Sequence, residues 1–218
     1  MWCKNCNVET NEGVCPICGK ITVEDIPVEV YWCKECKTPV VQNVNQADRG
    51  ICPICGKKTK YMAADLRPVF PEERLLLELL LGKKPHDYIE KSVWAANSRY
   101  YIDGESIAIS SKTFQTANAD YLIKEIEKYK HENSYEAFDK HISNFILANK
   151  DRLDYLKDEA FEFVRKTASK FDEEKIVLSF SGGKDSTVTA DIVVKALSNP
   201  SLVHIFGKTT LEFPSTVA

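Results

Sequence analysis

The sequence predicts an α/β chain built in four consecutive parts: two small four-cysteine units, a small β-rich module, a helical segment and the start of a parallel α/β domain. Three observations predict this order. All eight cysteines lie within the first 55 residues, apolar residues recur at helical spacing over residues 118–170, and a β-branched run followed by a glycine-rich loop begins at residue 176. The expected boundaries are 1–61, 62–117, 118–170 and 171–218.

The composition is that of an ordinary globular protein, with 218 residues of which 44% are hydrophobic and 28% charged. A net charge of -3 gives the whole chain no attraction for nucleic acid or an acidic membrane, so such binding needs a local patch. The N-terminus has no apolar signal segment. The longest apolar run, residues 75–81, is interrupted by Glu78 and too short to span a bilayer. We therefore expect a cytoplasmic protein without a membrane partner.

The cysteines form an internal repeat of Cys-x-x-Cys pairs, in which residues 2–6 are echoed by 32–36 and residues 15–20 by 52–57. Two turns that each carry two thiolates give the tetrahedral sulfur set that Zn²⁺ accepts, with iron as the alternative metal. Because four cysteines occupy all coordination positions of a tetrahedral ion, we expect two zinc ions with structural roles. The metal ligands are predicted to be Cys3, Cys6, Cys15 and Cys18 in one site, and Cys33, Cys36, Cys52 and Cys55 in the other.

The repeat favours this sequential grouping of the cysteines. A cross-braced grouping of Cys15 and Cys18 with Cys33 and Cys36 stays open, because the gap between these pairs is similar in length. A glycine follows the second pair of each unit and allows the backbone to curl so that its N–H groups point at sulfur.

The middle of the chain predicts a short helix and a hairpin. Residues 71–81 begin with Pro71, carry acids in the first turn and are followed by Gly82, all of which are typical of a helix. Residues 98–102 and 105–110 flank Asp103-Gly104, a dipeptide typical of a tight hairpin turn. The nearby aromatic residues can stack on bases, but a core role is favoured for them; they are Trp94, Tyr100 and Tyr101.

The apolar spacing over residues 118–170 predicts helices whose charged face is solvated. Asn118 and Ser134 are the candidate N-caps of these helices. No pair of carboxylates stands out there, so the catalytic residues stay unassigned. The four histidines have no ligand spacing and are expected to be structural or exposed; they are His86, His131, His141 and His204.

The C-terminal part of the sequence has the order of elements that is typical of phosphate binding. It predicts a strand at residues 176–180, then a glycine-rich loop, then a helix whose pattern begins at residue 187. Two glycines allow close approach to the backbone, and the helix N-terminus offers free N–H groups and a positive dipole end. The loop does not fit a Walker A motif. The predicted phosphate-binding residues are Ser181, Gly182, Gly183, Lys184, Asp185 and Ser186.

This loop resembles the Ser-Gly-Gly-x-Asp-Ser PP-loop of the ATP pyrophosphatase superfamily. Residues 207–216 resemble the Asp-Thr-Gly-Leu-Glu-Phe-Pro-Glu-Thr segment of phosphoadenosine phosphosulfate (PAPS) reductases and their relatives. The cysteine units and residues 94–104 are similar to a branch of this family that adds zinc ribbons and a PUA-like, RNA-binding-type module.

The resemblance implies a Rossmann-like sheet of the adenine nucleotide alpha hydrolase type, with ATP or PAPS as the nucleotide ligand. Thr209 and Glu212 match the second motif and are expected to edge the nucleotide pocket. Lys208, Thr210 and Ser215 depart from the motif. The loss of an acid and the gain of a cation favour anion binding but weaken the case for an acid-dependent step.

The leading prediction is a PAPS reductase-like oxidoreductase or an ATP-dependent sulfurtransferase, with a small molecule, tRNA or DNA as the candidate substrate. Reductases of this family use a late cysteine, whereas every cysteine here is assigned to a metal site. A sheet with only two strands also predicts an N-terminal portion that is inactive by itself and needs a separate C-terminal portion or a homo-oligomer.

Two other functions are kept as alternatives. One is a nucleic-acid-binding zinc-ribbon protein with a vestigial nucleotide domain, for which residues 57–60 beside Tyr61 supply a small basic cluster. The other is a structural scaffold without a ligand.

Overall fold

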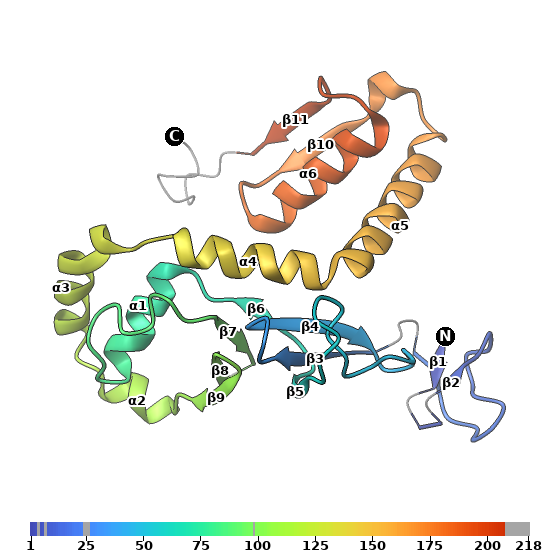
Figure 1. Cartoon of the computed structure of the whole chain (residues 1–218). Coiled ribbons are helices and arrows are strands. Elements are labelled where there is room, and N and C mark those ends of the chain that lie inside the picture. The colour runs from blue at the N-terminus through green and yellow to red at the C-terminus, as the bar shows by residue number, and fades with distance from the viewer. Residues whose placement is uncertain (4, 7, 24–26, 98, 208–218) are drawn as a thin grey trace. The chain divides into compact units, whose positions relative to one another are not determined.

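The computed structural model describes residues 1–207 apart from 4, 7, 24–26 and 98 (Figure 1). The chain divides into two compact units, Met1–Lys150 and Asp151–Ala218. Among the helices that the structure describes, none has the length and apolar composition that a membrane span requires.

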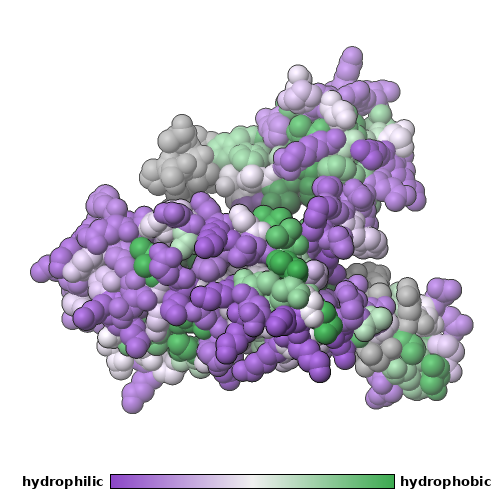
Figure 2. All heavy atoms as spheres, viewed as in Figure 1, coloured by the Kyte–Doolittle hydropathy of each residue, from purple (hydrophilic) through white to green (hydrophobic). Residues whose placement is uncertain are grey.

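The first unit begins with a small ribbon that has very little core. Its strands β1 (Trp2–Cys3) and β2 (Val8–Glu9) pair antiparallel, and Trp2 is buried. Figure 2 shows hydrophobic side chains on the surface of this ribbon, where the exposed apolar residues include Val14, Ile17 and Ile21. Because so few apolar side chains are buried, we expect the four cysteines and their metal to hold this ribbon together.

The second ribbon is built on a three-stranded antiparallel sheet. Strand β3 (Val28–Cys33) lies between β4 (Thr38–Asn43) and β5 (Lys60–Ala63). The buried side chain of Gln42 closes the following loop, because it accepts a hydrogen bond from Gly50 N at 2.7 Å and donates one to Ile51 O at 3.1 Å.

A four-stranded antiparallel sheet follows, formed by β6 (Arg67–Pro68), β7 (Val93–Ala96), β8 (Arg99–Ile102) and β9 (Glu105–Ala108). The predicted hairpin is confirmed as β8 and β9. Both turn residues have the positive φ that such a turn requires, +48° at Asp103 and +83° at Gly104.

Two helices accompany this sheet. The predicted helix is confirmed as α1 (Pro71–Leu80), with Pro71 in its first turn and Gly82 beyond its end at φ +66°. The short helix α2 (Ser111–Thr116) has no clear sequence signal and was not predicted.

The second ribbon and the four-stranded sheet share one hydrophobic core. Trp32 of β3 packs in the same cluster as Trp94 and Tyr101, which are 2% and 7% exposed. The predicted core role of these two aromatic residues is therefore confirmed. Tyr100 is half-buried and donates a hydrogen bond to Glu73.

The helical segment starts with α3 (Ala119–Tyr129), a short turn (Lys130–Glu132) and α4 (Glu136–Ala148). Asn118 caps α3 as predicted, because its side chain accepts a hydrogen bond from Tyr121 N. The prediction for Ser134 was wrong by one residue. Tyr135 is the N-cap of α4, its backbone is already helical, and its hydroxyl donates to Glu72.

Helix α4 packs on the three-stranded and the four-stranded sheet of the first unit (Figure 1). Phe145 lies against Trp94 with ring centroids 5.0 Å apart. Asn149, buried at the end of the helix, accepts a hydrogen bond from Val41 N and donates to Pro39 O, so it joins α4 to the backbone of β4.

The second unit contains a strand–helix–strand arrangement. Strands β10 (Val177–Phe180) and β11 (Val203–Phe206) pair directly in parallel, and helix α6 (Lys184–Leu197) connects them. They follow α5 (Lys150–Ala168) and a short turn (Glu173–Lys175). Arg165 of α5 donates a hydrogen bond to Ala196 O of α6 at 2.9 Å. The further strands of a Rossmann-like sheet stay a prediction.

We expect Gly104→Ala to destabilise the shared core. A Cβ at this position would lie 2.3 Å from Trp32 Cδ1, and the φ of +83° adds backbone strain. Gly50→Ala is the matched control, because Gly50 has the same φ but open space around its Cβ position. In thermal unfolding, Gly104→Ala should cost at least about 2 kcal/mol more than the control. Equal costs would show that Trp32 does not pack against this turn.

Candidate metal centres and phosphate-binding loop

The structure brings the eight cysteines into two groups of four. In each group the sulfur atoms all lie within 4.8 Å of one another, and the groups are Cys3, Cys6, Cys15 and Cys18, and Cys33, Cys36, Cys52 and Cys55. The grouping follows the sequential repeat and not the cross-braced alternative.

The sulfur separations fit a tetrahedral metal site. Zinc–sulfur bonds of about 2.3 Å in a tetrahedron place neighbouring sulfurs about 3.8 Å apart. The Cys3–Cys18 and Cys33–Cys55 sulfur pairs are each 3.6 Å apart, and the Cys36–Cys52 pair is 3.9 Å apart. All eight cysteines are free of disulfide bonds. Four converging thiols with this spacing can hold one divalent ion in each ribbon.

The backbone around the sulfurs is repeated in the two ribbons. Cys6 N donates to Cys3 Sγ, and Cys36 N donates to Cys33 Sγ, at 3.4 Å in both cases. Gly19 and Gly56 follow the second cysteine pairs with φ of +69° and +67°. These left-handed glycines turn the chain so that later N–H groups face the sulfurs, as the sequence predicted.

The thiols of each group have unequal acidities. The backbone N–H of Lys20 lowers the pKa of Cys18, and that of Lys57 lowers the pKa of Cys55. By contrast, the hydrogen bond with Cys18 raises the pKa of Cys6 to about 12, and burial raises the pKa of Cys36. Four adjacent thiolates repel one another, so a bound cation is needed for all of them to ionise.

The glycine-rich loop joins the end of β10 to the start of α6. Gly182 has φ +75°, a conformation that favours glycine, and Gly183 is the N-cap residue of α6. Among the described residues no side chain caps this helix. The first turn of a helix leaves backbone N–H groups without intrahelical acceptors, and these groups are a ready site for an anion.

Three hydroxyl groups form hydrogen bonds within the loop. Ser186 Oγ donates to Gly183 O at 2.9 Å and accepts from Ser181 Oγ at 3.1 Å. Thr187 Oγ1 also donates to Gly183 O at 3.0 Å. Thr187 was not predicted to take part, although its place one residue after the motif was visible in the sequence. These bonds hold the loop in one conformation before any ligand binds.

The charged residues of the motif are open to solvent. The side chains of Lys184 and Asp185 are 89% and 88% exposed and form an ion pair with each other. An added Cβ at Gly183 would find Ser181 Oγ at 3.5 Å as its nearest neighbour, which is ordinary van der Waals contact. The protein itself therefore leaves space at Gly183 that a ligand can use.

The described residues include the first motif but not the second. Ser181, Gly182, Gly183, Lys184, Asp185 and Ser186 all belong to the β10–α6 connection. Thr209 and Glu212 lie outside the described residues, so their placement beside the loop stays a prediction.

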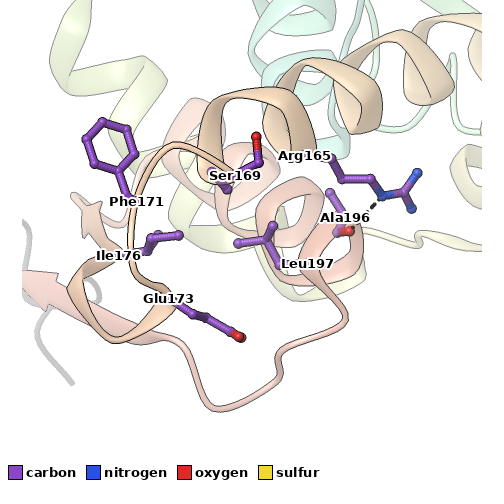
Figure 3. A pocket seen from close by; sticks show the side chains of 8 residues that line it. Arg165, Ser169, Phe171, Glu173, Ile176, Ala196 and Leu197 are labelled. Carbon is purple, nitrogen blue, oxygen red and sulfur yellow. Dashed lines mark hydrogen bonds between the residues drawn. The ribbon is translucent and has the colours of Figure 1, made fainter.

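An open hollow of about 380 Å³ lies at the other end of α6, between the end of α5 and Leu197 (Figure 3). Its walls include Arg165, Phe171 and Ile176. A helix of 14 residues is about 20 Å long, so this hollow is well separated from the phosphate loop. It is not the predicted nucleotide site.

Part of the chain is similar to known proteins. Residues 175–218 match the family model described as "phosphoadenosine phosphosulfate reductase domain". An uncharacterized protein of Methanocaldococcus jannaschii is 33% identical over 97 residues, which is 44% of this chain and 20% of that protein. No solved structure matches the chain.

The strand, the glycine-rich loop and the helix follow one another in the order that phosphate-binding elements of α/β domains have. Together with the family match, this order of elements makes residues 175–218 similar to the PAPS reductase domain.

Proposed function

We propose that this chain supplies the nucleotide-binding start of a PAPS reductase-like enzyme, which reduces an activated sulfate or uses ATP for sulfur transfer. The observation that supports this most directly is the uncapped N-terminus of α6, placed directly after β10 and the Gly182–Gly183 turn. The family match over residues 175–218 favours an adenine nucleotide as the ligand.

In this proposal the loop binds the phosphate or sulfate groups of the nucleotide. The free N–H groups of the first α6 turn donate to the ligand oxygens, and the helix dipole favours their negative charge. Lys184 exchanges its exposed ion pair with Asp185 for the stronger charge of the ligand. The serine hydroxyls are already fixed, so little conformational entropy is lost on binding.

The two cysteine groups are proposed to hold zinc. A bound ion supplies a structural cross-link, because four thiolates leave no open coordination position for a substrate. The ribbons therefore carry no step of the reaction. Since all eight cysteines of the sequence lie in these groups, a thiol for sulfate reduction must come from elsewhere.

The test is calorimetric binding of ATP and PAPS to the zinc-loaded chain, compared with Lys184→Ala and Lys195→Ala. Both lysines lie on α6, but Lys195 is at the far end and pairs with Asp191. We expect Lys184→Ala to weaken binding by at least about tenfold, which is 1.4 kcal/mol, and Lys195→Ala to leave it unchanged. Equal losses in both variants, or binding unaffected by Lys184→Ala, would contradict the proposal.

One observation favours nucleic-acid binding as a second candidate function. Tyr61 is 54% exposed and stands edge-on to Tyr31, with ring centroids 5.9 Å apart. Three exposed lysines precede it closely in the sequence, Lys57, Lys58 and Lys60. An exposed aromatic ring beside cations can stack a base and bind the backbone phosphates. If tRNA or single-stranded DNA binds the chain without nucleotide, and Lys184→Ala changes nothing, this second function is the better one.

A further inference from the structure

A small enclosed cavity lies inside the first unit, where α1, α4 and strands β6 and β7 meet. Its volume is about 10 Å³, which is close to the roughly 10–15 Å³ that a single water molecule needs. Most of its walls are apolar, including Trp94 and Phe138. The polar side chains that line it are Arg74, Lys91 and His141. Lys91 is already paired with Asp103 at 2.9 Å.

Arg74 brings unused hydrogen-bond donors to this cavity. Its residue is 3% exposed, and its Nη1 donates to Ile89 O at 3.3 Å. Its Nε and Nη2 are buried and have no hydrogen-bond acceptor among the residues that the structure describes. Glu78 Oε1 lies 3.7 Å from Nε, which is too far for a hydrogen bond. The Glu78 oxygens accept instead from the backbone N–H groups of His86 and Tyr88.

His141 brings an unused acceptor. Its Nε2 lies 3.3 Å from the backbone oxygen of Glu90. A carbonyl oxygen only accepts, so Nε2 must carry the proton and donate it. In a neutral ring, Nδ1 is then an acceptor, and this atom is buried without a donor in the described part of the chain. Two residues that line the cavity therefore carry buried polar atoms without a partner in the described part of the chain, namely two donor nitrogens of Arg74 and one acceptor nitrogen of His141.

We propose that this cavity binds one ordered water molecule, which accepts a hydrogen bond from the Arg74 guanidinium group and donates one to Nδ1 of His141. Water fits because it both accepts and donates, whereas a monatomic anion only accepts and leaves Nδ1 unsatisfied. The cavity volume excludes a larger ligand. The charge of Arg74 is balanced by Glu78 at 3.7 Å, so a neutral ligand suffices.

Such a water joins α1 to α4 in the interior of the first unit. Helix α4 is held at its end by Asn149, and the proposed water holds it one to two turns after its start, at His141. The bridge would satisfy groups whose burial otherwise costs about 1–3 kcal/mol each.

A crystal structure of the full, zinc-loaded chain at about 1.5 Å resolution tests this directly. We expect a density peak within about 2.7–3.2 Å of both a guanidinium nitrogen of Arg74 and Nδ1 of His141. A cavity without a peak, or a direct contact between the two side chains, would overturn the proposal.

Solution NMR gives a second test that does not depend on crystals. Long-range ¹H–¹⁵N spectra should show His141 as the neutral tautomer protonated at Nε2, and the Arg74 Nε–H should give a cross-peak to bound water. His141→Phe keeps a ring but removes Nδ1, so this cross-peak should be lost. His131→Phe, at an exposed position, should preserve it. A proton on Nδ1, or no water cross-peak in the unaltered chain, would also refute the site.

Discussion

Replacing Cys52 with serine should unfold much more of the protein than replacing Cys15. Both changes remove one ligand from a four-cysteine group and should halve the bound metal. Cys52, however, belongs to the ribbon whose Trp32 packs with Trp94 and Tyr101. Loss of the second metal should therefore loosen the shared core and lower its free energy of unfolding by about 4 kcal/mol or more.

The measurements are elemental analysis, near-ultraviolet circular dichroism and hydrogen exchange of β7. Cys15→Ser should lose one ion, disturb the surroundings of Trp2 and leave the exchange of β7 slow, because the first ribbon has its own small sheet. Cys52→Ser should lose one ion and accelerate exchange in β7. If β7 is protected equally in both variants, the second ribbon does not stabilise the module.

The substitution Gly183→Ala should abolish most nucleotide binding without harming the fold. Gly183 has φ −82°, which alanine adopts readily, and its Cβ would meet only Ser181 Oγ at 3.5 Å. The same methyl group would stand at the N-terminus of α6, where a phosphate must approach the backbone. We expect binding of ATP or PAPS to weaken by about a hundredfold, which is 2.7 kcal/mol.

Gly13→Ala is the control for this change, because an added Cβ there has open space and the residue lies in the first ribbon. Its stability and nucleotide affinity should both match those of the unaltered chain. A Gly183→Ala variant that unfolds at the same temperature and binds the nucleotide equally well would show that phosphate does not bind at this turn.

Features with local causes could be predicted from the sequence. The Asp103-Gly104 turn, the Pro71 start of α1 and the Asn118 cap each depend on residues within a few positions, and the structure shows all three. The cysteine groups could also be predicted, because their repeat favours the sequential grouping that the structure shows.

Features with distant causes could not be predicted. Trp32 and Trp94 meet in one core although 61 residues separate them. The local sequence around either residue does not indicate this contact. The bonds of Asn149 to β4 span 108 and 110 residues. At Ser134 the prediction was wrong only in position, because the Ser134 hydroxyl accepts a hydrogen bond from Glu136 N at 3.3 Å although Tyr135 is the N-cap residue of α4.

The nucleotide site could be predicted only in part. The loop is a contiguous motif, and its strand and helix have clear patterns. The walls of a nucleotide pocket come from segments distant in sequence, and the expected contributors Thr209 and Glu212 lie outside the described residues.

The most direct test of phosphate binding is an amide ¹H–¹⁵N titration of the zinc-loaded chain with PAPS and, separately, with ATP. We expect the largest shifts at the backbone amides of Gly182, Gly183 and Lys184, with the cysteine ribbons unaffected, and no such shifts in Gly183→Ala. Shifts confined to the ribbons, to the hollow beside Leu197, or to no residue at all would contradict the assignment of residues 181–186 as the nucleotide-binding loop.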